Sequence, residues 1–482
     1  MKKLLGSVLA LVMLFGFSWP AGATEILKNL KVNGSMDFQA TSARNVLDFN
    51  SYQNDRIGTA MTRVIVDTNW DLLDDFHSVI TLRKNDRAWG ANTSAGQGSD
   101  GGQRLVGNAA NDDIASSVVV QQAYVKIDKF AGQLDAQVGR QYYGEPGDLV
   151  VYFGPKGNYG LYVTALDGFR VDWNNDMLGI TGLAAKFGAN NIGTNANTES
   201  DLRGIDVLVK NMPAKLNAFI YNSVGHRNST NSPGGVRIYE PNNNLWIYGV
   251  KAKMEAEGAY VTAQLAGNLG ELRETSRVAL YRGWAGLFDA GYKAEVANVG
   301  NFTPWLNFGF GTGDQGTGAK SHGFTSIASG YTPGIINGRF NNSGAQTLEC
   351  QINGNAYDVG TVGLTNRVIY GLGLKATPAA AEKLVLGLGF WDYRYQTMTT
   401  GDTRFHVNSA VANAKTSRHI GYEYGLTADW KHSENVTYGM GVARFHPGRL
   451  INDANSSTAE PVATRGGVSP IFMAFADMAL KF

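Results

Sequence analysis

The sequence lacks the cysteine pairs that form disulfides in small exported domains, and beyond its first residues it lacks the long apolar runs that anchor helices in a membrane. It has one cysteine, Cys350, so no internal disulfide framework can form. It contains no CxxCH haem motif and no Cys/His spacing typical of a zinc site. Beyond residue 23, no apolar run approaches the roughly 18 residues that indicate a spanning helix. These absences predict a chain that binds no metal and no other cofactor.

An excess of charge is also missing. The 42 basic and 41 acidic residues nearly balance, which argues against nucleic acid as a partner. The seven histidines are scattered, and no Ser/His/acid set or metal-ligating set follows from their spacing. We therefore expect that the protein is not an enzyme, and an outer-membrane hydrolase is the least favoured hypothesis.

Residues 1–23 have the pattern of a secretory signal peptide. Lys2 and Lys3 precede an apolar run that ends at Trp19, and Ala21-Gly22-Ala23 follows as a cleavage site. We predict cleavage after Ala23 and a single mature domain, 24–482. A membrane anchor is the alternative, disfavoured because the run is short. An exported chain with 60 glycines and 11 % aromatic residues is either a soluble β-rich protein or an outer-membrane β-barrel.

Long stretches of strict alternation favour the barrel. In "LKVNGSMDFQA" (30–40) every second residue, from Leu30 to Ala40, is apolar or glycine, and polar residues lie between them. The pattern recurs in 284–296 and 420–430. Eleven residues exceed a typical soluble strand of about five or six, and match the roughly 9–11 residues of a membrane-spanning strand.

The connections between the predicted strands alternate between short and long, which is typical of a bacterial outer-membrane barrel. We therefore expect an all-β fold: a closed antiparallel transmembrane β-barrel in the outer membrane of a Gram-negative bacterium, with short periplasmic turns and long extracellular loops. A count of 16 strands remains an alternative to 18. The predicted strands are 30–40, 57–72, 76–88, 116–128, 133–142, 167–174, 177–187, 203–211, 214–223, 245–254, 258–267, 283–296, 302–310, 366–377, 383–393, 419–432, 435–445 and 470–482.

The C-terminal "FADMALKF" predicts the strand that closes the barrel. Met478, Leu480 and Phe482 fall on one face, toward the lipid, and the expected pairing partner is strand 30–40. The terminal Phe resembles the assembly signal of outer-membrane barrels, which implies the barrel assembly machinery as a partner. Outer-membrane lipid and lipopolysaccharide are the other expected partners. The alternative is a buried final strand of a soluble domain.

The opposite face of these strands predicts the lining of a pore. Rings of Arg and Lys in a pore attract anions. Pairing with acids such as Asp172 across the wall is an equally weighted alternative. The inward basic candidates are Arg63, Arg83, Arg87, Lys126, Arg170, Lys210, Lys251 and Lys253.

A barrel of 18 strands is too wide to be filled by its own wall side chains, so a selective pore needs a constriction. Two loops are candidates, 142–160 and 311–365, and the alternative is that both only cover the mouth. Tyrosine rings in the first loop could stack on sugar faces. The residues proposed for the constriction are Tyr142, Tyr143, Glu145, Asp148, Tyr152 and Lys156.

The stretch "LDAQVGRQYYGEPGDLVVYFGPKGNYG", followed by "DGFRVDW", resembles a segment of the alginate-export-type outer-membrane porins. The resemblance covers roughly residues 30–175. It implies an 18-stranded monomeric barrel, an Arg/Lys-rich lumen for an anionic polysaccharide, and roles for Arg140 and Arg170. The alternation places Arg140 on the lipid face, so either it lies at the outer rim or a bulge near Gly139 turns it inward.

The leading functional hypothesis is a porin for passive diffusion of small or elongated polar solutes, with a preference for anions or acidic saccharides. The alternative is a scaffold, a barrel that sheathes a partner such as a multihaem cytochrome in trans.

Overall fold

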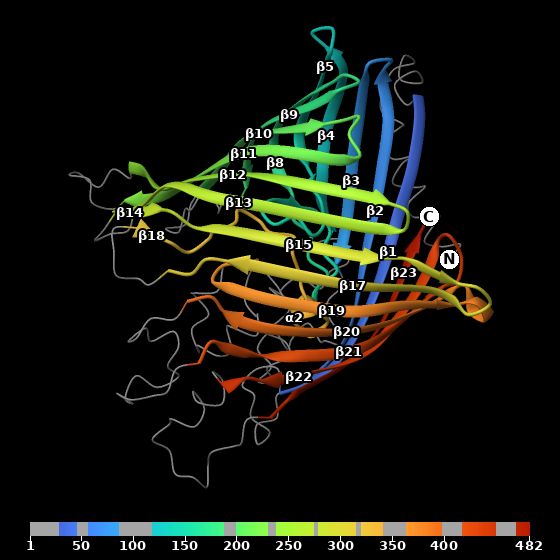
Figure 1. Ribbon diagram of the computed structural model, residues 1–482. Helices are drawn as coiled ribbons and strands as arrows, with labels where there is room; N and C mark the ends of the chain where they lie inside the picture. The colour runs from blue at the N-terminus through green and yellow to red at the C-terminus, as the bar shows by residue number, and fades with distance from the viewer. Residues whose placement is uncertain are drawn as a thin grey trace, which may run out of the picture.

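The computed structural model describes residues 28–45, 56–85, 118–187, 199–229, 238–273, 278–314, 320–340, 363–397, 417–449 and 469–482. One large antiparallel sheet closes on itself into a barrel (Figure 1). Eighteen long strands form its wall, and each predicted strand overlaps one of them, so the predicted fold class is confirmed. The signal peptide, 1–23, lies outside the described ranges and stays a prediction.

The strands of the wall, in chain order, have the following bounds: β1 (Lys28–Arg44), β2 (Ile57–Leu73), β3 (Phe76–Asn85), β4 (Val118–Phe130), β5 (Leu134–Gln141), β8 (Leu166–Asn174), β9 (Leu178–Phe187), β10 (Glu199–Val209), β11 (Ala214–Ser229), β12 (Ile238–Ala256), β13 (Ala259–Arg273), β15 (Trp284–Tyr292), β17 (Gly300–Gly311), β19 (Arg367–Pro378), β20 (Leu384–Tyr395), β21 (His419–Lys431), β22 (Val436–Pro447) and β23 (Ile471–Lys481). The shorter elements are β6 (Tyr143–Gly144), β7 (Tyr152–Phe153), β14 (Val278–Tyr281), β16 (Ala294–Val296), β18 (Lys320–Ser321), the helix α2 (Ile336–Phe340) and the 3₁₀ turn η4 (Ala379–Ala381).

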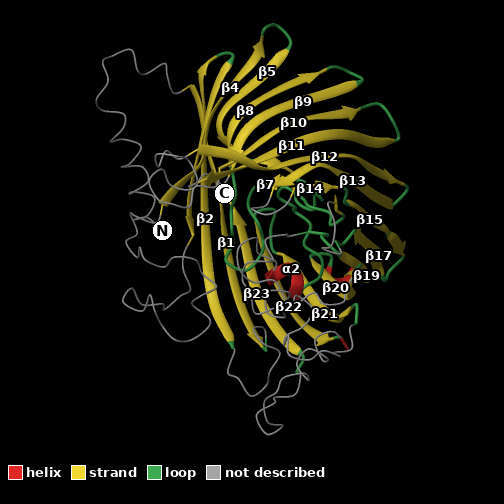
Figure 2. Ribbon diagram, turned by 90° about the vertical axis from the view of Figure 1, so that its left-hand side faces the viewer, coloured by secondary structure: helices red, strands yellow, loops and turns green. Residues whose placement is uncertain are grey.

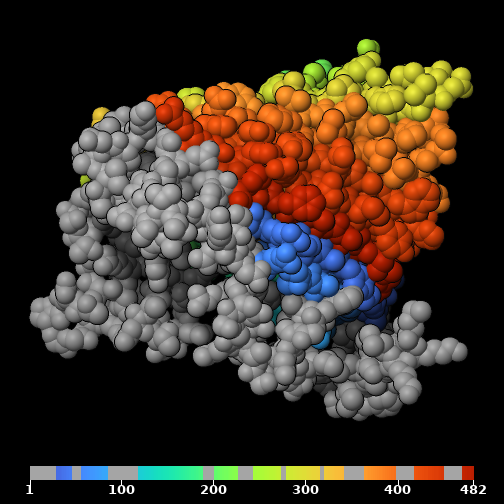
Figure 3. All heavy atoms as spheres, turned by 90° about the horizontal axis from the view of Figure 1, so that it is seen from below, coloured from blue at the N-terminus to red at the C-terminus, as the bar shows by residue number. Residues whose placement is uncertain are grey.

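The first and last strands close the barrel. β23 pairs with β1, with Met478 opposite Phe38 and Leu480 opposite Met36. Gly34 and Phe482 exchange backbone hydrogen bonds of 2.8 and 3.0 Å. Figure 3 shows this seam from outside, where the blue first strands lie directly beside the red last ones. The predicted pairing is confirmed, and closure leaves no unpaired edge along this seam.

The outer face of the wall is apolar. Leu372, Leu426 and Met440 each expose more than half of their surface, at 57 %, 56 % and 58 %. In water a contiguous band of such side chains would be strongly unfavourable, whereas a bilayer solvates it. Trp284 begins β15 at the long-loop end, and Tyr292 ends it at the short-turn end, as expected for aromatic girdles at the two interfaces. Within the described ranges, no helix is long and apolar enough to cross a membrane.

Short turns join the strands at one end of the barrel because their residues tolerate left-handed backbone angles. Glu257 and Gly258 link β12 to β13 with φ angles of 48° and 83°. Two successive positive φ angles are the signature of the two-residue hairpin turn whose twist matches that of the flanking strands.

Two segments from the long-loop end fold back into the barrel (Figure 2). The first segment, 142–165, follows β5, and the second segment, 320–340, follows β17 and ends with α2. They bond to each other: the Tyr152 amide donates to the Ala328 carbonyl at 2.6 Å, and the Tyr159 amide to the Arg339 carbonyl at 2.6 Å. Both candidate loops therefore contribute to the interior, rather than only covering the mouth. Cys350 lies outside the described residues.

Candidate functional site

Arg63 fixes the first segment to the wall from β2. Its guanidinium donates to Asp37 Oδ2 through Nε at 3.0 Å and Nη2 at 2.8 Å. Its Nη1 donates to the carbonyls of Lys156 at 2.7 Å and Leu161 at 3.1 Å. Only 6 % of Arg63 is exposed. Arg63 faces inward as expected, but its guanidinium donates to the chain itself, so it holds the first segment in place instead of offering a free charge.

Lys251 and Gln264 hold the first segment from the opposite side, on β12 and β13. Lys251 Nζ lies 2.9 Å from Glu145 Oε2 and 3.5 Å from Asp148 Oδ2. The Leu149 amide donates to Gln264 Oε1 at 2.9 Å. The hydrogen bond from Lys251 lowers the pKa of the Glu145 carboxyl. Glu145 thus remains ionised across the neutral range and faces the lumen.

Tyrosines of the first segment pack instead of lining an open track. Tyr143 is 8 % exposed and lies edge-on to Tyr221, with the two hydroxyls 3.0 Å apart. Tyr152 is 7 % exposed and donates to the Pro155 carbonyl at 2.6 Å. Burial raises the pKa of Tyr143 to about 12 and keeps it neutral. Tyr159 is also buried, so these three rings expose little surface to a sugar, and the expected stacking of sugars stays a prediction.

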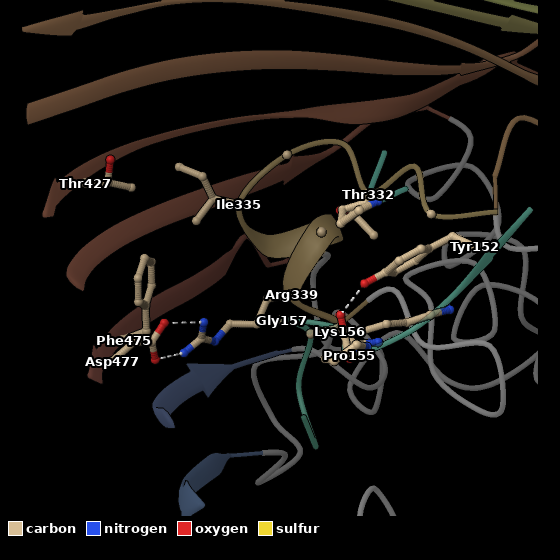
Figure 4. A pocket seen from close by; sticks show the side chains of 15 residues that line it. Tyr152, Pro155, Lys156, Gly157, Thr332, Ile335, Arg339, Thr427, Phe475 and Asp477 are labelled. Carbon is tan, nitrogen blue, oxygen red and sulfur yellow. Dashed lines mark hydrogen bonds and ion pairs between the residues drawn. The ribbon is translucent and has the colours of Figure 1, made fainter. Parts of the chain in front are cut away.

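Tyr142 and Lys156 complete the predicted constriction set. Tyr142 is half-buried, and burial raises the pKa of its hydroxyl, which has no hydrogen-bond partner in the described part of the chain. Lys156 lines a cavity with a volume of about 360 Å³ between the two segments and strands β21 and β23 (Figure 4). Burial lowers the pKa of Lys156.

Arg339 and Glu423 anchor the second segment. Arg339 in α2 donates to both carboxylate oxygens of Asp477, at 3.0 and 2.6 Å, and to Thr41 Oγ1 at 2.8 Å. Figure 4 shows the guanidinium reaching across to Asp477 beside the ring of Phe475. Glu423, fully buried on β21, accepts hydrogen bonds from the backbone amides of residues 335, 336 and 337.

A second cavity lies on the other side of the first segment, against β8 to β12. Its volume is about 360 Å³, and charged side chains dominate its lining. Four are cationic, namely Arg170, Lys215, Lys251 and Lys253, and three are carboxylates, namely Glu145, Asp148 and Asp206. We call it the charged cavity. It brings together three of the predicted pore-lining residues, Arg170, Lys251 and Lys253, and three of the predicted constriction residues, Tyr143, Glu145 and Asp148.

Several predicted pore-lining cations are paired within the wall. Arg170 contacts Asp172 at 2.8 Å, Lys126 contacts Asp128 at 2.6 Å, and Lys253 contacts Glu255 at 3.2 Å. Each of these partners lies two residues along the same strand, so the alternative in which lumen charges pair across strands describes Arg63 with Asp37 but not these three pairs. Their effect on solutes stays a prediction.

The remaining basic candidates lie away from the charged cavity. Lys210 bonds to Asn174 and the Asn175 carbonyl at a short turn. Arg83 pairs in register with the inward Ile65, and its Nε is buried without a hydrogen-bond partner in the described ranges. Arg87 lies outside the described residues.

Arg140 lies on the outer face of the wall. It is in register with Ala123 on β4 and with Asp167 on β8, and its Nη1 contacts Asp167 Oδ2 at 2.8 Å. Gly139 has a φ of 127°, but the register continues through it without a bulge. Arg140 is therefore not a pore-lining residue, and the expectation of a bulge that turns it inward is wrong.

Sequence reasoning missed four residues of the interior. Lys215 and Gln264 lie on the inward parity of their strands, so the alternation could have found them. Glu423 also lies at an inward position of its strand, but its function as an acceptor for the amides of residues 335–337 could not be predicted without the position of α2. Arg339 lies within the longest predicted loop, where no periodic pattern orients a side chain.

No known family model matches this chain, and no curated protein is similar to it in sequence. Solved structures do match in fold. A BenF-like porin from Pseudomonas fluorescens Pf-5 has a TM-score of 0.52 at 10 % identity, covering 95 % of this chain and 99 % of that chain. OprD from Pseudomonas aeruginosa has a TM-score of 0.52 at 9 % identity, covering 95 % of both chains. OpdK from the same organism, solved with vanillate, has a TM-score of 0.50 at 9 % identity, covering 95 % and 99 %.

Identities this low show the fold alone, and they do not confirm the alginate-export-type resemblance. The closed wall of 18 strands agrees with these matches. The chain is thus an 18-stranded β-barrel with the outer-membrane porin fold that OprD and the OccK-type channels share.

Proposed function

We propose that the protein is an outer-membrane channel for the passive diffusion of small polar solutes, with a modest preference for anions. The observation that carries this proposal is the charged cavity inside the barrel, where four cationic side chains face three carboxylates. The porin fold supports the channel role, and no catalytic step is needed for it.

The preference for anions rests on which charges remain available. Lys251 engages two of the three carboxylates, Glu145 and Asp148. Lys215 has no ion pair within the described ranges, and Lys253 keeps 52 % of its side chain exposed. A cation in a narrow pore with low-dielectric walls attracts anions more strongly than it would in water. The near balance of charge keeps the preference modest.

The size of the cavity favours small solutes over polysaccharides. A volume of about 360 Å³ suits a small organic anion, and Tyr143, Tyr152 and Tyr159 each expose less than a tenth of their surface. OpdK was solved with vanillate, an aromatic carboxylate, and this class is a reasonable first test solute.

The scaffold hypothesis is not favoured. A barrel that sheathes a protein partner needs an open lumen, whereas the first and second segments of this chain occupy the interior and bond to each other. The cavities beside them are too small for a folded chain.

The test is planar-bilayer recording of the refolded barrel under a salt gradient, with wild type and the double variant Lys215→Gln/Lys251→Gln. We expect stable open steps and an anion-selective reversal potential for the wild type. The double variant should shift the reversal potential toward cation selectivity. The control is Arg444→Gln, which removes the same kind of charge from the outer face and should leave selectivity unchanged.

Heat-modifiable migration in electrophoresis verifies folding before each recording. A folded barrel without conductance would contradict the channel. A conducting barrel with cation selectivity would contradict the proposed role of the charged cavity while leaving the channel intact. Reversal potentials with sodium vanillate in place of chloride then extend the test to organic anions.

A further inference from the structure

The outer wall over β8 to β12 carries a groove with a volume of about 490 Å³. Its floor is made by small residues, Gly182 and Ala184 on β9. A Cβ atom at Gly182 would meet only the Val171 carbonyl, at 4.0 Å, so the missing side chain leaves open space and is not demanded by packing. The rims are large apolar side chains that expose 40–50 % of their surface, namely Phe169, Ile205, Ile220 and Trp246.

Arg203 lies at the end of this groove that is nearer to the long extracellular loops. It is in register with Ala184 on one side and Asn222 on the other, and Asn222 is in register with Trp246. Tryptophan marks the level where the hydrocarbon region of a membrane gives way to headgroups. No ion pair of Arg203 is present within the described ranges, and its side chain is exposed.

The charges just above Arg203 are already paired. Arg140 contacts Asp167 at 2.8 Å, and Lys186 contacts Asp201 at 3.5 Å, in the register row one alternation step toward the long loops. This row bounds the apolar band on the extracellular side. Arg203 is thus a cation at the boundary, directly below a charge-neutral row and directly above an apolar groove.

We propose that this groove binds a phosphorylated glycolipid of the outer leaflet, the lipid A part of lipopolysaccharide. One acyl chain lies in the groove over Gly182 and Ala184, and a phosphate of the headgroup accepts hydrogen bonds from the Arg203 guanidinium. Arginine suits this role because its planar donor fork matches phosphate geometry. The groove supplies apolar area to the chain, and Arg203 supplies charge complementarity to the anionic headgroup.

The test is native mass spectrometry of the delipidated full-length barrel in detergent, titrated with lipid A. Arg203→Gln should weaken binding by about tenfold, the loss expected for a charge-assisted hydrogen bond. Gly182→Leu fills the groove while leaving the charge intact and should also weaken binding. Lys215→Gln is the matched control, because it removes one charge from the lumen, where lipid cannot reach, and should leave the affinity unchanged.

Three further arms separate the sources of binding. Dephosphorylated lipid A and phosphatidylethanolamine should each bind more weakly than lipid A, and excess inorganic phosphate should not displace it. Equal losses in Arg203→Gln and Lys215→Gln, or tight binding of dephosphorylated lipid A, would overturn the proposal. An unchanged affinity in Gly182→Leu would overturn the role of the groove. Arg203→Gln should conduct like wild type, so this test is independent of the channel function.

Discussion

The first and second segments enter the same lumen, and each is bonded to a buried charged residue of the wall, Arg63 or Glu423, but the charges that the segments themselves carry lie in different environments. The first segment presents Glu145 to the lumen, because this residue keeps 74 % of its side chain exposed while it pairs with Lys251. The second segment buries its anchors: Arg339 keeps 7 % of its side chain exposed, and Glu423 is fully buried. One segment therefore carries charges that a passing solute can meet, and the other carries charges that mainly hold its own position.

Because of this difference, we expect the charges of the first segment to act mainly on ion selectivity and those of the second segment mainly on the stability of the fold. An exposed ion pair contributes little to folding because water and salt screen it. A buried charge that loses its partner costs several kcal/mol because it stays desolvated. Neutralising charges on the second segment should therefore change stability most, and neutralising charges on the first segment should change ion selectivity most.

Arg339→Met should give the largest loss of stability. It leaves Asp477 without its bidentate partner, and we expect a cost at the low end of about 3–5 kcal/mol, because Asp477 keeps some contact with water. Urea unfolding in lipid vesicles measures the change. A loosened second segment should also make single-channel recordings noisier.

Arg394→Met is the matched control for that experiment. Arg394 also pairs with an aspartate, Asp392, but keeps 53 % of its side chain exposed at the outer rim of the barrel. Its removal should cost less than about 1 kcal/mol. Equal losses of unfolding free energy in Arg339→Met and Arg394→Met would contradict the expected difference between buried and exposed anchors.

Glu423→Gln should have the next largest effect. The two carboxylate oxygens accept from three backbone amides, with Oε1 facing residues 335 and 336 and Oε2 facing Asn337 at 3.2 Å. A glutamine places an NH₂ group against one of these donors, which costs about 1–3 kcal/mol for the unsatisfied amide. Hydrogen exchange of the amides 335–337 should speed up, while that of amides 149–151 in the first segment stays the same. Unchanged exchange at 335–337 would show that Glu423 does not hold α2.

The wall could be predicted from the sequence because the alternation between lipid-facing and lumen-facing residues repeats along every strand. A residue such as Leu426 or Met440 faces lipid since every second position does, and a shift of one residue would expose the whole polar face. The same rule placed Arg140 on the outer face, where the structure has it paired with Asp167. The resemblance to another porin family suggested an inward role for Arg140, and the alternation was the better guide.

The interior could be predicted only in part. The mixture of aromatic and charged residues in 142–160 predicted a loop that enters the lumen. Its tyrosines, however, pack against the wall through partners on distant strands, such as Tyr221 for Tyr143. Arg339 lies 138 residues from Asp477. No local pattern encodes such a contact, because it depends on where two loops meet inside a closed barrel.

Glu145→Gln should have the smallest effect on stability and a measurable effect on selectivity. Because the Glu145–Lys251 pair is exposed on the Glu145 side, its loss should cost less than about 1 kcal/mol. It removes one carboxylate from the charged cavity, so the reversal potential should shift further toward anions. The same shift of the reversal potential should occur in the wild type at acid pH, at a pH set by the pKa of Glu145.

Lys251 lowers the pKa of the Glu145 carboxyl below the ordinary 4.5, so the negative charge persists above pH 4.5 and is lost only as the pH falls through the lowered value. Reversal potentials recorded from neutral pH to below 4.5 should therefore converge for wild type and Glu145→Gln only at the acid end. Convergence well above 4.5 would show that Lys251 does not hold Glu145 ionised in the open channel, and that the first segment moves when the channel conducts.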